Sequence, residues 1–368
     1  MKEEREFAGF VLSFAVGIFS VTGSEIISYT HTSAFSSLSL TGIVMLMTAL
    51  MNPGFRRRNS MAVRIAVPVL GLLCGTFIGT GHIVCLPCTS EQSFTNGLRK
   101  LGKDIGSFIE NMGFSDQDTG SVLKALITGD RKGMPEHVIE SFRDSGAAHI
   151  LALSGFHLSI IYVIVSKSLA LSGGGRKTLV LKSVITATFC GIYTLATGAG
   201  PSICRAFIFI LLGEASTLFH RKKTTSALLL SALFIQLVLN PLSIRTVSFQ
   251  LSYAAMAGIA YIFPYMKNLW KKDDDDQWKI LRKIWESASM SISCQLTTGP
   301  LAFHHFGTLP EHFLLTNLIA LPLTALIIPT ALLTMLLTSV SLCPAFLVQM
   351  TEFLVHVLIR SLEIIAGM

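Results

Sequence analysis

The chain has 368 residues, of which 51% are hydrophobic and only 14% are charged, and its mean hydropathy is +0.60. A soluble domain carries about 25% charged residues, so this composition excludes a water-soluble enzyme and a disordered chain. The apolar stretches are continuous and not alternating, which excludes a membrane β-barrel. The net charge of +7 is informative mainly through where the cations lie. We therefore expect an all-α fold, a polytopic bundle of transmembrane helices.

Eleven stretches of the chain are apolar enough to cross a bilayer, which takes about 20 residues each. The expected spans are residues 7–23, 34–51, 62–85, 150–171, 179–197, 203–219, 225–239, 248–264, 287–303, 313–335 and 345–366. In the third span, Gly71, Gly75 and Gly79 recur every four residues and predict close approach of another helix. Pro322 and Pro329 leave open whether the tenth span is one kinked helix or two.

The cations predict how these spans are oriented. With a cytoplasmic amino terminus, 18 Lys and Arg residues fall in cytoplasmic segments, whereas the short opposite loops hold only Arg245. The positive-inside rule therefore predicts a cytoplasmic amino terminus. The same topology places the long segment 86–148 outside the cytoplasm.

The segment 86–148 is expected to be mostly helical. Asp116 and its neighbours are typical of a helix start and Gly129 of a helix end, and Pro135 then opens a second helix that ends near Ser145. The chain is thus divided into a three-span amino-terminal segment (residues 1–85), an extracytoplasmic helical loop (86–148) and a membrane core (149–368).

Several polar side chains fall within or at the edge of the expected spans, where an ionisable group costs roughly 2.5 to 3.5 kcal/mol and normally faces a partner or water. These groups are His149, Ser154 and His157 in the fourth span, Arg205 and Glu214 in the sixth, Gln250 in the eighth, Gln295 in the ninth and Asn317 in the tenth. Arg205 and Glu214 lie about 13.5 Å apart along one helix, so they cannot pair directly. Gly198–Pro201 predicts either a helix start aimed at an anion or a plain tight turn.

Three other patterns favour structural roles over chemistry. A dithiol redox site, a metal site and a Ser–His hydrolase site are the alternatives, but each lacks the context that such chemistry needs. The residues concerned are Cys85 and Cys88 for redox chemistry, His304, His305, Glu311 and His312 for a metal, and Ser154 and His157 for hydrolysis.

Five ordered blocks of sequence resemble the ComEC family of competence proteins. They are Ala125–Arg131 with Phe142–His157, Gly200–Ala206, Asn240–Pro241 with Phe249–Gly258, Gly299–Phe306, and Leu315–Pro322. The resemblance implies a multi-pass channel of the bacterial inner membrane that passes single-stranded DNA into the cytoplasm during natural transformation. Carried over position by position, it implies that the transport pathway or its scaffold includes Asp130, Arg131, His149, Ser154, His157, Arg205, Gln250 and Asn317.

The chain also departs from the family pattern. It contains no His-x-His-x-Asp-His sequence of the family's nuclease-like domain, and the segment 86–148 is too helical for the family's OB-like domain. We therefore expect a channel module that is not an enzyme and has no cofactor or metal. Its expected partners are single-stranded DNA, membrane lipid, a separate nuclease, a DNA receptor, a cytoplasmic translocase ATPase and further copies of the chain. The alternative is a small-molecule or anion permease, or a membrane scaffold, on the same fold.

Overall fold

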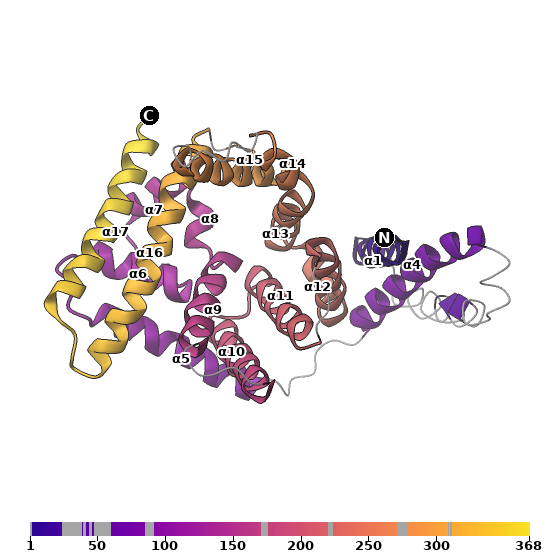
Figure 1. The fold of residues 1–368 in the computed structure, drawn as a ribbon, viewed down its shortest axis with the longest axis horizontal. Coiled ribbons are helices and arrows are strands. Elements are labelled where there is room, and N and C mark those ends of the chain that lie inside the picture. Colours follow the sequence, from indigo (N-terminus) through magenta and orange to yellow (C-terminus); the bar gives the residue numbers. More distant parts are fainter. Residues whose placement is uncertain are drawn as a thin grey trace. The chain divides into compact units, whose positions relative to one another are not determined.

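The computed structural model describes residues 2–23, 39, 42–43, 46–47, 60–84, 92–170, 176–219, 224–270, 279–307, 309 and 311–368. Helices are the only regular elements among these residues, so the predicted all-α class is confirmed (Figure 1). The chain forms two compact units, residues 1–91 with 220–253, and residues 92–219 with 254–368. The division at residues 85 and 148 concerns membrane topology and stays a prediction.

The first unit is built on two helices that approach each other closely through glycine. A Cβ atom on Gly71 or Gly75 of α4 would overlap the backbone carbonyl oxygens of Phe10 or Phe14 in α1. This confirms the expected role of those two glycines, whereas the surroundings of Gly79 lie outside the described residues. The helices of this unit are α1 (Lys2–Gly23), α4 (Ser60–Val84), α12 (Thr225–Leu239), η2 (Pro241–Arg245) and the first part of α13 (Val247–Ala257).

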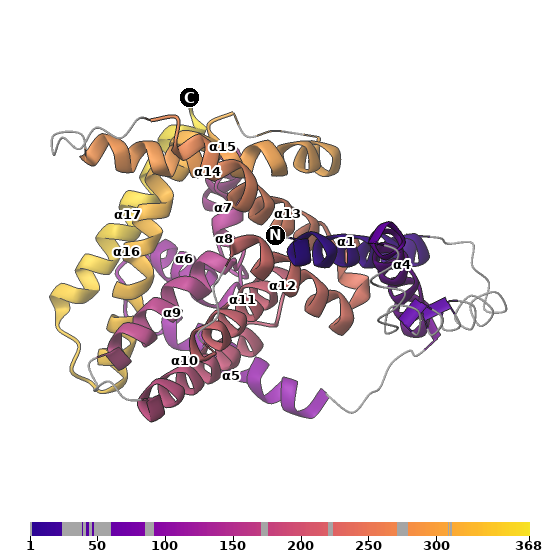
Figure 2. The same cartoon turned by 45° about the vertical axis from the view of Figure 1, so that its right-hand side comes forward.

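The second unit holds most of the described helices. Those that precede residue 220 are α5 (Gln92–Glu110), α6 (Gln117–Thr128), α7 (Glu136–Asp144), α8 (Ala148–Leu151), α9 (Gly155–Ala170), α10 (Arg176–Ala196) and α11 (Pro201–Leu218). Those that follow residue 253 are η3 (Gly258–Ile262), α14 (Phe263–Lys267), α15 (Lys279–Phe306), α16 (Phe313–Ser339) and α17 (Ala345–Ala366). Figure 2 shows α15 crossing near one end of α16.

One hydrophobic core joins α6 and α7 to the last two helices, beside which they lie in Figure 1. Val122 and Leu126 of α6 are buried with Ile327 of α16 and Leu358 of α17. The hydroxyl of Thr316 in α16 also donates to the carbonyl oxygen of Ser145, 2.6 Å away. The segment 92–148 is therefore helical as predicted, and it packs with the apolar helices instead of forming a separate lobe.

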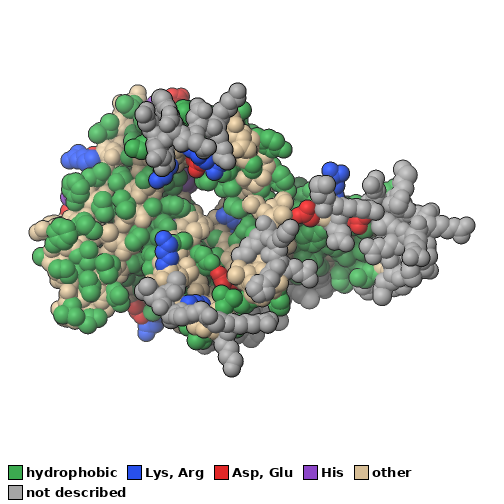
Figure 3. Space-filling model, in the orientation of Figure 1, with side chains coloured by type: hydrophobic (Ala, Val, Ile, Leu, Met, Phe, Trp, Pro, Cys, Tyr) green, Lys and Arg blue, Asp and Glu red, His purple; other side chains and the backbone are tan. Residues whose placement is uncertain are grey.

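Five helical stretches are long and apolar enough to cross a membrane by length and composition: Thr178–Ala196, Pro201–Leu218, Val247–Lys267, Phe313–Ser339 and Ala345–Ala366. Three shorter apolar stretches, Ile65–Ile78, Gly155–Leu169 and Thr225–Leu239, lie in expected spans as well. Hydrophobic side chains cover most of the visible face where α16 and α17 lie (Figure 3). The expected total of eleven spans is not confirmed, and the span at 34–51 lies largely outside the described residues.

The structure settles whether the tenth expected span is one helix or two, and it changes where the fourth begins. The tenth is one continuous helix, α16, which contains both Pro322 and Pro329. The fourth, expected near residues 150–171, begins later in the structure. The short helix α8 ends at Leu151, and α9 begins at Gly155. The sequence concealed this break, because Ala152 and Leu153 in the link are strong helix formers.

Candidate functional site

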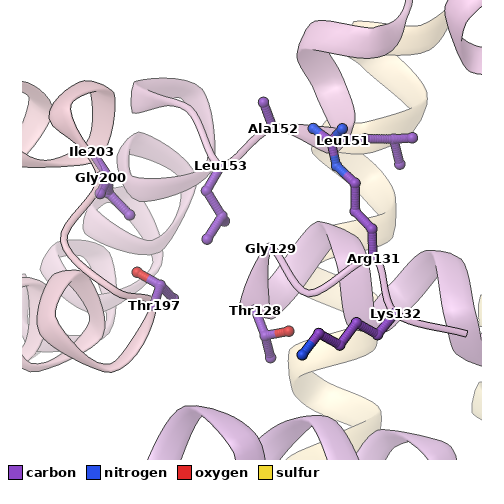
Figure 4. A pocket seen from close by; sticks show the side chains of 10 residues that line it. All are labelled: Thr128, Gly129, Arg131, Lys132, Leu151, Ala152, Leu153, Thr197, Gly200 and Ile203. Atoms are coloured by element: carbon purple, nitrogen blue, oxygen red, sulfur yellow. The ribbon is translucent and has the colours of Figure 1, made fainter. Parts of the chain in front are cut away.

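A cavity of about 570 Å³ lies in the second unit, where the α6–α7 loop faces the amino end of α11 (Figure 4). Two cations, two threonines, two glycines and four aliphatic residues line it. The lining residues are Thr128, Gly129, Arg131, Lys132, Leu151, Ala152, Leu153, Thr197, Gly200 and Ile203. Two of the expected sequence blocks, the one ending at Arg131 and the one beginning at Gly200, therefore meet here.

The floor of the cavity is the sharp turn that ends α6. Asp116 caps the start of this helix by accepting from the Asp118 amide, and Gly129 ends it in the left-handed region at φ 77°. A side chain on Gly129 would also meet Leu153, whose Cδ1 atom would lie 2.6 Å from the Cβ position. The predicted start and end of this helix are confirmed, and only glycine fits the turn.

Lys124 holds this turn from inside the protein. Its ammonium group lies 2.8 Å from a carboxylate oxygen of Glu110, 3.3 Å from one of Asp130, and 3.1 Å from the carbonyl oxygen of Lys132. The Lys124 side chain is only 11% exposed. The carboxylate of Asp130 additionally accepts from the Lys132 amide at 3.1 Å. Asp130 is thus occupied by the fold, and its predicted place on a pathway is that of a scaffold residue.

These contacts shift the pKa values of both partners toward their charged forms. The hydrogen bond to Glu110, followed by the interactions with Asp130, raises the pKa of Lys124 above its usual 10.5 against the opposing effect of burial. Burial acts to raise the pKa of Asp130, but hydrogen bonds from the Lys132 amide and from Lys124 lower it below the usual 3.8. Both shifts favour the charged forms of Lys124 and Asp130 at neutral pH.

The two cations of the loop are in the opposite situation. Arg131 and Lys132 are exposed, and neither side chain forms a salt bridge or hydrogen bond with any residue that the structure describes. In Figure 4 the guanidinium group of Arg131 extends toward Leu151 and Ala152, and the Lys132 chain extends toward Thr128. The charge of Lys132 acts on Asp130, but the salt bridge of that carboxylate is made with Lys124.

The opposite wall of the cavity is the turn between α10 and α11. Gly198 and Ala199 both take positive φ, 90° and 52°, and Ala199 is a non-glycine residue in that region, which marks a tightly constrained turn. Helix α11 then starts at Pro201 with Gly200 as its N-cap and no side chain capping it. The segment Gly198–Pro201 is thus a tight turn that leads directly into a helix start beside the cavity. That this helix start is aimed at an anion stays a prediction.

Ser154 and His157 form the cap of α9. The Ser154 hydroxyl accepts from the Phe156 amide at 3.3 Å, and the His157 Nδ1 atom lies 3.1 Å from that hydroxyl and accepts from the Ser154 amide at 3.4 Å. This arrangement matches a capping box with histidine in the usual place of glutamate. The neutral ring then carries its hydrogen on Nε2, which is buried and has no partner among the described residues. The geometry is that of a cap and not of a nucleophile with an oriented base.

Arg205 lies at the same end of α9. It is 7% exposed, and one of its terminal nitrogens lies 3.4 Å from the Cβ position of Gly155. Its charge also reaches the thiol of Cys294 in α15. The structure therefore brings Ser154, His157 and Arg205 together.

His149 and Asn317 form a neighbouring pair. The His149 Nδ1 atom donates to the carbonyl oxygen of Gly146 at 3.0 Å, and its ring interacts with the Asn317 side chain. His149, which was expected at the edge of the fourth span, lies in the short helix α8 that precedes α9. The pair ties α8 to α16 beside the link that borders the cavity.

Two further polar groups lie elsewhere. Gln250 belongs to the first compact unit, where its side-chain amide donates to the carbonyl oxygen of Ile244 at 3.1 Å. Glu214 accepts from the hydroxyls of Tyr162 at 2.6 Å and Ser183 at 2.5 Å. Glu214 thus joins α9, α10 and α11 at a distance from the cavity lining.

Sequence reasoning missed Lys124, Lys132 and Thr197. Lys124 is a lone cation in the apolar stretch of α6, and Lys132 adjoins Arg131, so both carried a signal in the sequence. Thr197 carried none. Among the described residues no three His, Cys, Asp or Glu side chains gather to hold a metal, and Cys85 and Cys88 lie outside the described residues.

The part of the chain that contains this cavity matches a known protein family. Residues 126–368, which contain every predicted site residue, match the Competence protein family. The chain belongs to this family. It is 26% identical over 259 residues to ComE operon protein 3 of Bacillus subtilis (strain 168), which covers 69% of this chain and 31% of that protein. It is 24% identical over 215 residues to the uncharacterized protein YcaI of Escherichia coli (strain K12), which covers 56% and 28% respectively.

The matches extend over less than a third of either relative's length, and no solved structure matches. The predicted resemblance to the ComEC family is confirmed, because the first relative belongs to the ComE operon and the Competence family covers most of the chain. With its apolar helices, the chain is a membrane protein of the competence type.

Proposed function

We propose that this chain forms part of the route by which single-stranded DNA crosses the bacterial inner membrane into the cytoplasm, and that it performs no catalytic step itself. Its amino terminus lies in the cytoplasm, in agreement with the distribution of cations near the spans. Strand degradation, DNA capture and energy input come from other chains: a nuclease, a receptor and a translocase ATPase.

The observation that carries this proposal is the placing of cations on both sides of one short link. The link consists of Ala152–Ser154, between α8 and α9. Its first residues line the cavity with Arg131 and Lys132, and its end meets Arg205 beside Gly155. A strand with one negative charge per phosphate needs successive positive groups along its path, and cations at membrane depth are expensive unless they face water or a partner.

The two helix amino ends strengthen the same field. The start of α11 faces the cavity, and the start of α9 lies beside Arg205. Each helix amino end carries a partial positive charge of about half a unit. Both the ends and the cations thus favour an anion, without any group suited to bond cleavage.

The test replaces Arg205 in the chromosomal copy and measures natural transformation. We expect Arg205→Ala to lower transformation at least tenfold, and Arg205→Lys, which keeps the charge, to lower it less. Arg360→Ala is the matched control, because Arg360 is 80% exposed and pairs within α17 with Glu363. Each variant's amount in the membrane is measured alongside. Transformation at the normal level with Arg205→Ala would contradict the proposed role.

A second candidate function is a permease for small anions. The cavity volume of about 570 Å³ favours it, because pockets for small ligands measure roughly 300–1,000 Å³. Uptake of a labelled organic phosphate into vesicles that contain the chain separates the two functions. A small-anion flux without any effect on transformation would support the permease.

A further inference from the structure

The lining of the cavity differs from that of most surfaces that bind single strands. Such surfaces combine cations with aromatic side chains on which bases stack, each stack contributing roughly 1–3 kcal/mol. The ten lining residues here include two cations, Arg131 and Lys132, but no aromatic side chain and no carboxylate among the described residues. The lining therefore offers contacts to phosphate and nothing for a base to stack on.

The hydrogen-bond donors of the cavity support this distinction. The hydroxyls of Thr128 and Thr197 already donate to backbone carbonyl oxygens, at 2.7 Å and 2.9 Å. The charged side chains of Arg131 and Lys132, by contrast, donate no hydrogen bond to any described residue. Both groups are strong donors to phosphate oxygens.

The opposite wall leaves room for a ligand to reach the backbone. A Cβ atom on Gly200 would meet nothing within 4 Å, so the space beside this N-cap is open. Helix α11 has 18 residues and no side-chain cap, and the positive end of its dipole faces the cavity. A phosphate oxygen fits such a helix start without any side chain in its way.

We infer that this cavity binds the sugar-phosphate backbone of a single strand through Arg131, Lys132 and the start of α11, and makes no contact that distinguishes bases. The inference rests on the proposed function and names the part of the DNA that this site recognises. The bound group is a phosphodiester, which also occurs in lipid headgroups, so the test includes both sources.

The experiment uses the full chain in nanodiscs of neutral lipid. The probes are a fluorescent 20-residue oligothymidine, the same length of abasic strand, sodium phosphate, and soluble glycerophosphoglycerol as a lipid headgroup. The test variant is Arg131→Ala with Lys132→Ala. The charge-matched control is Arg143→Ala with Arg360→Ala, which removes two cations that are 70% and 80% exposed outside the cavity.

We expect the oligothymidine and the abasic strand to bind within threefold of each other. The cavity variant should weaken both at least tenfold and reduce the slope of log affinity against log salt by about 1.4, because each lost phosphate contact on a single strand contributes about 0.7. The control should leave affinity and slope unchanged.

Three results would overturn the inference. At least tenfold tighter binding of oligothymidine than of the abasic strand would show that bases are read, while leaving DNA passage itself standing. Unchanged strand binding by the cavity variant would place the site elsewhere. Binding of sodium phosphate or glycerophosphoglycerol that depends on Arg131 and Lys132, with no binding of either strand, would overturn the DNA role as well and assign the cavity to a small anion or a lipid headgroup.

Discussion

Lys124 and the pair Arg131 and Lys132 lie within nine residues of sequence but have opposite surroundings. Lys124 is buried and satisfied by Glu110, Asp130 and a backbone carbonyl. Arg131 and Lys132 are exposed at the cavity. The first cation serves the fold, and the other two remain available to a ligand because the first has engaged Asp130.

The largest expected effect comes from breaking this division with Lys124→Ala. It leaves two carboxylates without their partner, and we expect a loss of roughly 1–3 kcal/mol in the free energy of unfolding. It also releases Asp130 to pair with Arg131, so oligonucleotide binding should fall several-fold. Denaturant unfolding in detergent and the binding assay measure the two effects.

A double variant separates the loss of stability from the change in charge. Lys124→Ala with Asp130→Asn should recover oligonucleotide affinity, because no carboxylate is left in the loop to neutralise Arg131. Lys103→Ala on the exposed face of α5 is the control and should change stability by less than about 0.5 kcal/mol. If the double variant bound as weakly as Lys124→Ala alone, Asp130 would not be the competing group.

The next effect is a difference in stability between substitutions of two glycines in the α6–α7 loop. Gly129 and Gly133 both have positive φ, 77° and 82°, but only the Cβ position of Gly129 meets a neighbour, Leu153. Gly133→Ala should cost about 1 kcal/mol of unfolding free energy for its backbone conformation. Gly129→Ala should cost roughly 0.5–1.5 kcal/mol more, because the Leu153 side chain must leave its rotamer to relieve the overlap. Equal losses would show that the link moves freely away from the loop.

A smaller effect is expected at the cap of α9. Ser154→Ala removes the N-cap and should lower the free energy of unfolding by about 1 kcal/mol. Ser159→Ala, on the same helix, removes only a hydroxyl that donates to the carbonyl oxygen of Gly155 and should have a smaller effect. If instead Ser154 were a nucleophile, its loss would abolish a hydrolytic activity without changing stability.

The smallest effect is the pH dependence of the Asp130 contacts. Because the folded pKa of Asp130 lies below its unfolded value of 3.8, its stabilisation is fully present above that value and is lost as the pH falls through the folded pKa. The difference in unfolding free energy between the wild type and Asp130→Asn should therefore be constant near neutral pH. It should shrink as the pH falls below 3.8. A difference that grew in acid would contradict the assigned contacts.

The sequence predicted those parts of the site that local rules determine. Asp116 and Gly129 marked the ends of α6, and Gly200 with Pro201 marked the start of α11, because caps and turns depend on neighbouring residues. The break after Leu151 was missed, since the capping of α9 by His157 replaces the usual glutamate with a residue that the sequence rule does not contain.

Contacts between distant segments could not be predicted in the same way. Lys124 meets Glu110 from a different helix, and the packing of α6 on α16 and α17 joins segments some 200 residues apart. Hydrophobic periodicity specifies which face of a helix is buried, but not which helix covers it. For this reason the sequence did not predict that Lys132 and Thr197 line the same cavity.

The central claim is that transported DNA passes the cavity, and crosslinking in cells tests it most directly. A photoreactive amino acid replaces Thr197 at the cavity or, as control, Leu181 on α10, which is 58% exposed. Cells then take up labelled DNA, are illuminated, and are assayed for DNA attached to the protein. The account predicts crosslinks from position 197 and none from position 181. Continued uptake with no crosslink from position 197 would contradict it.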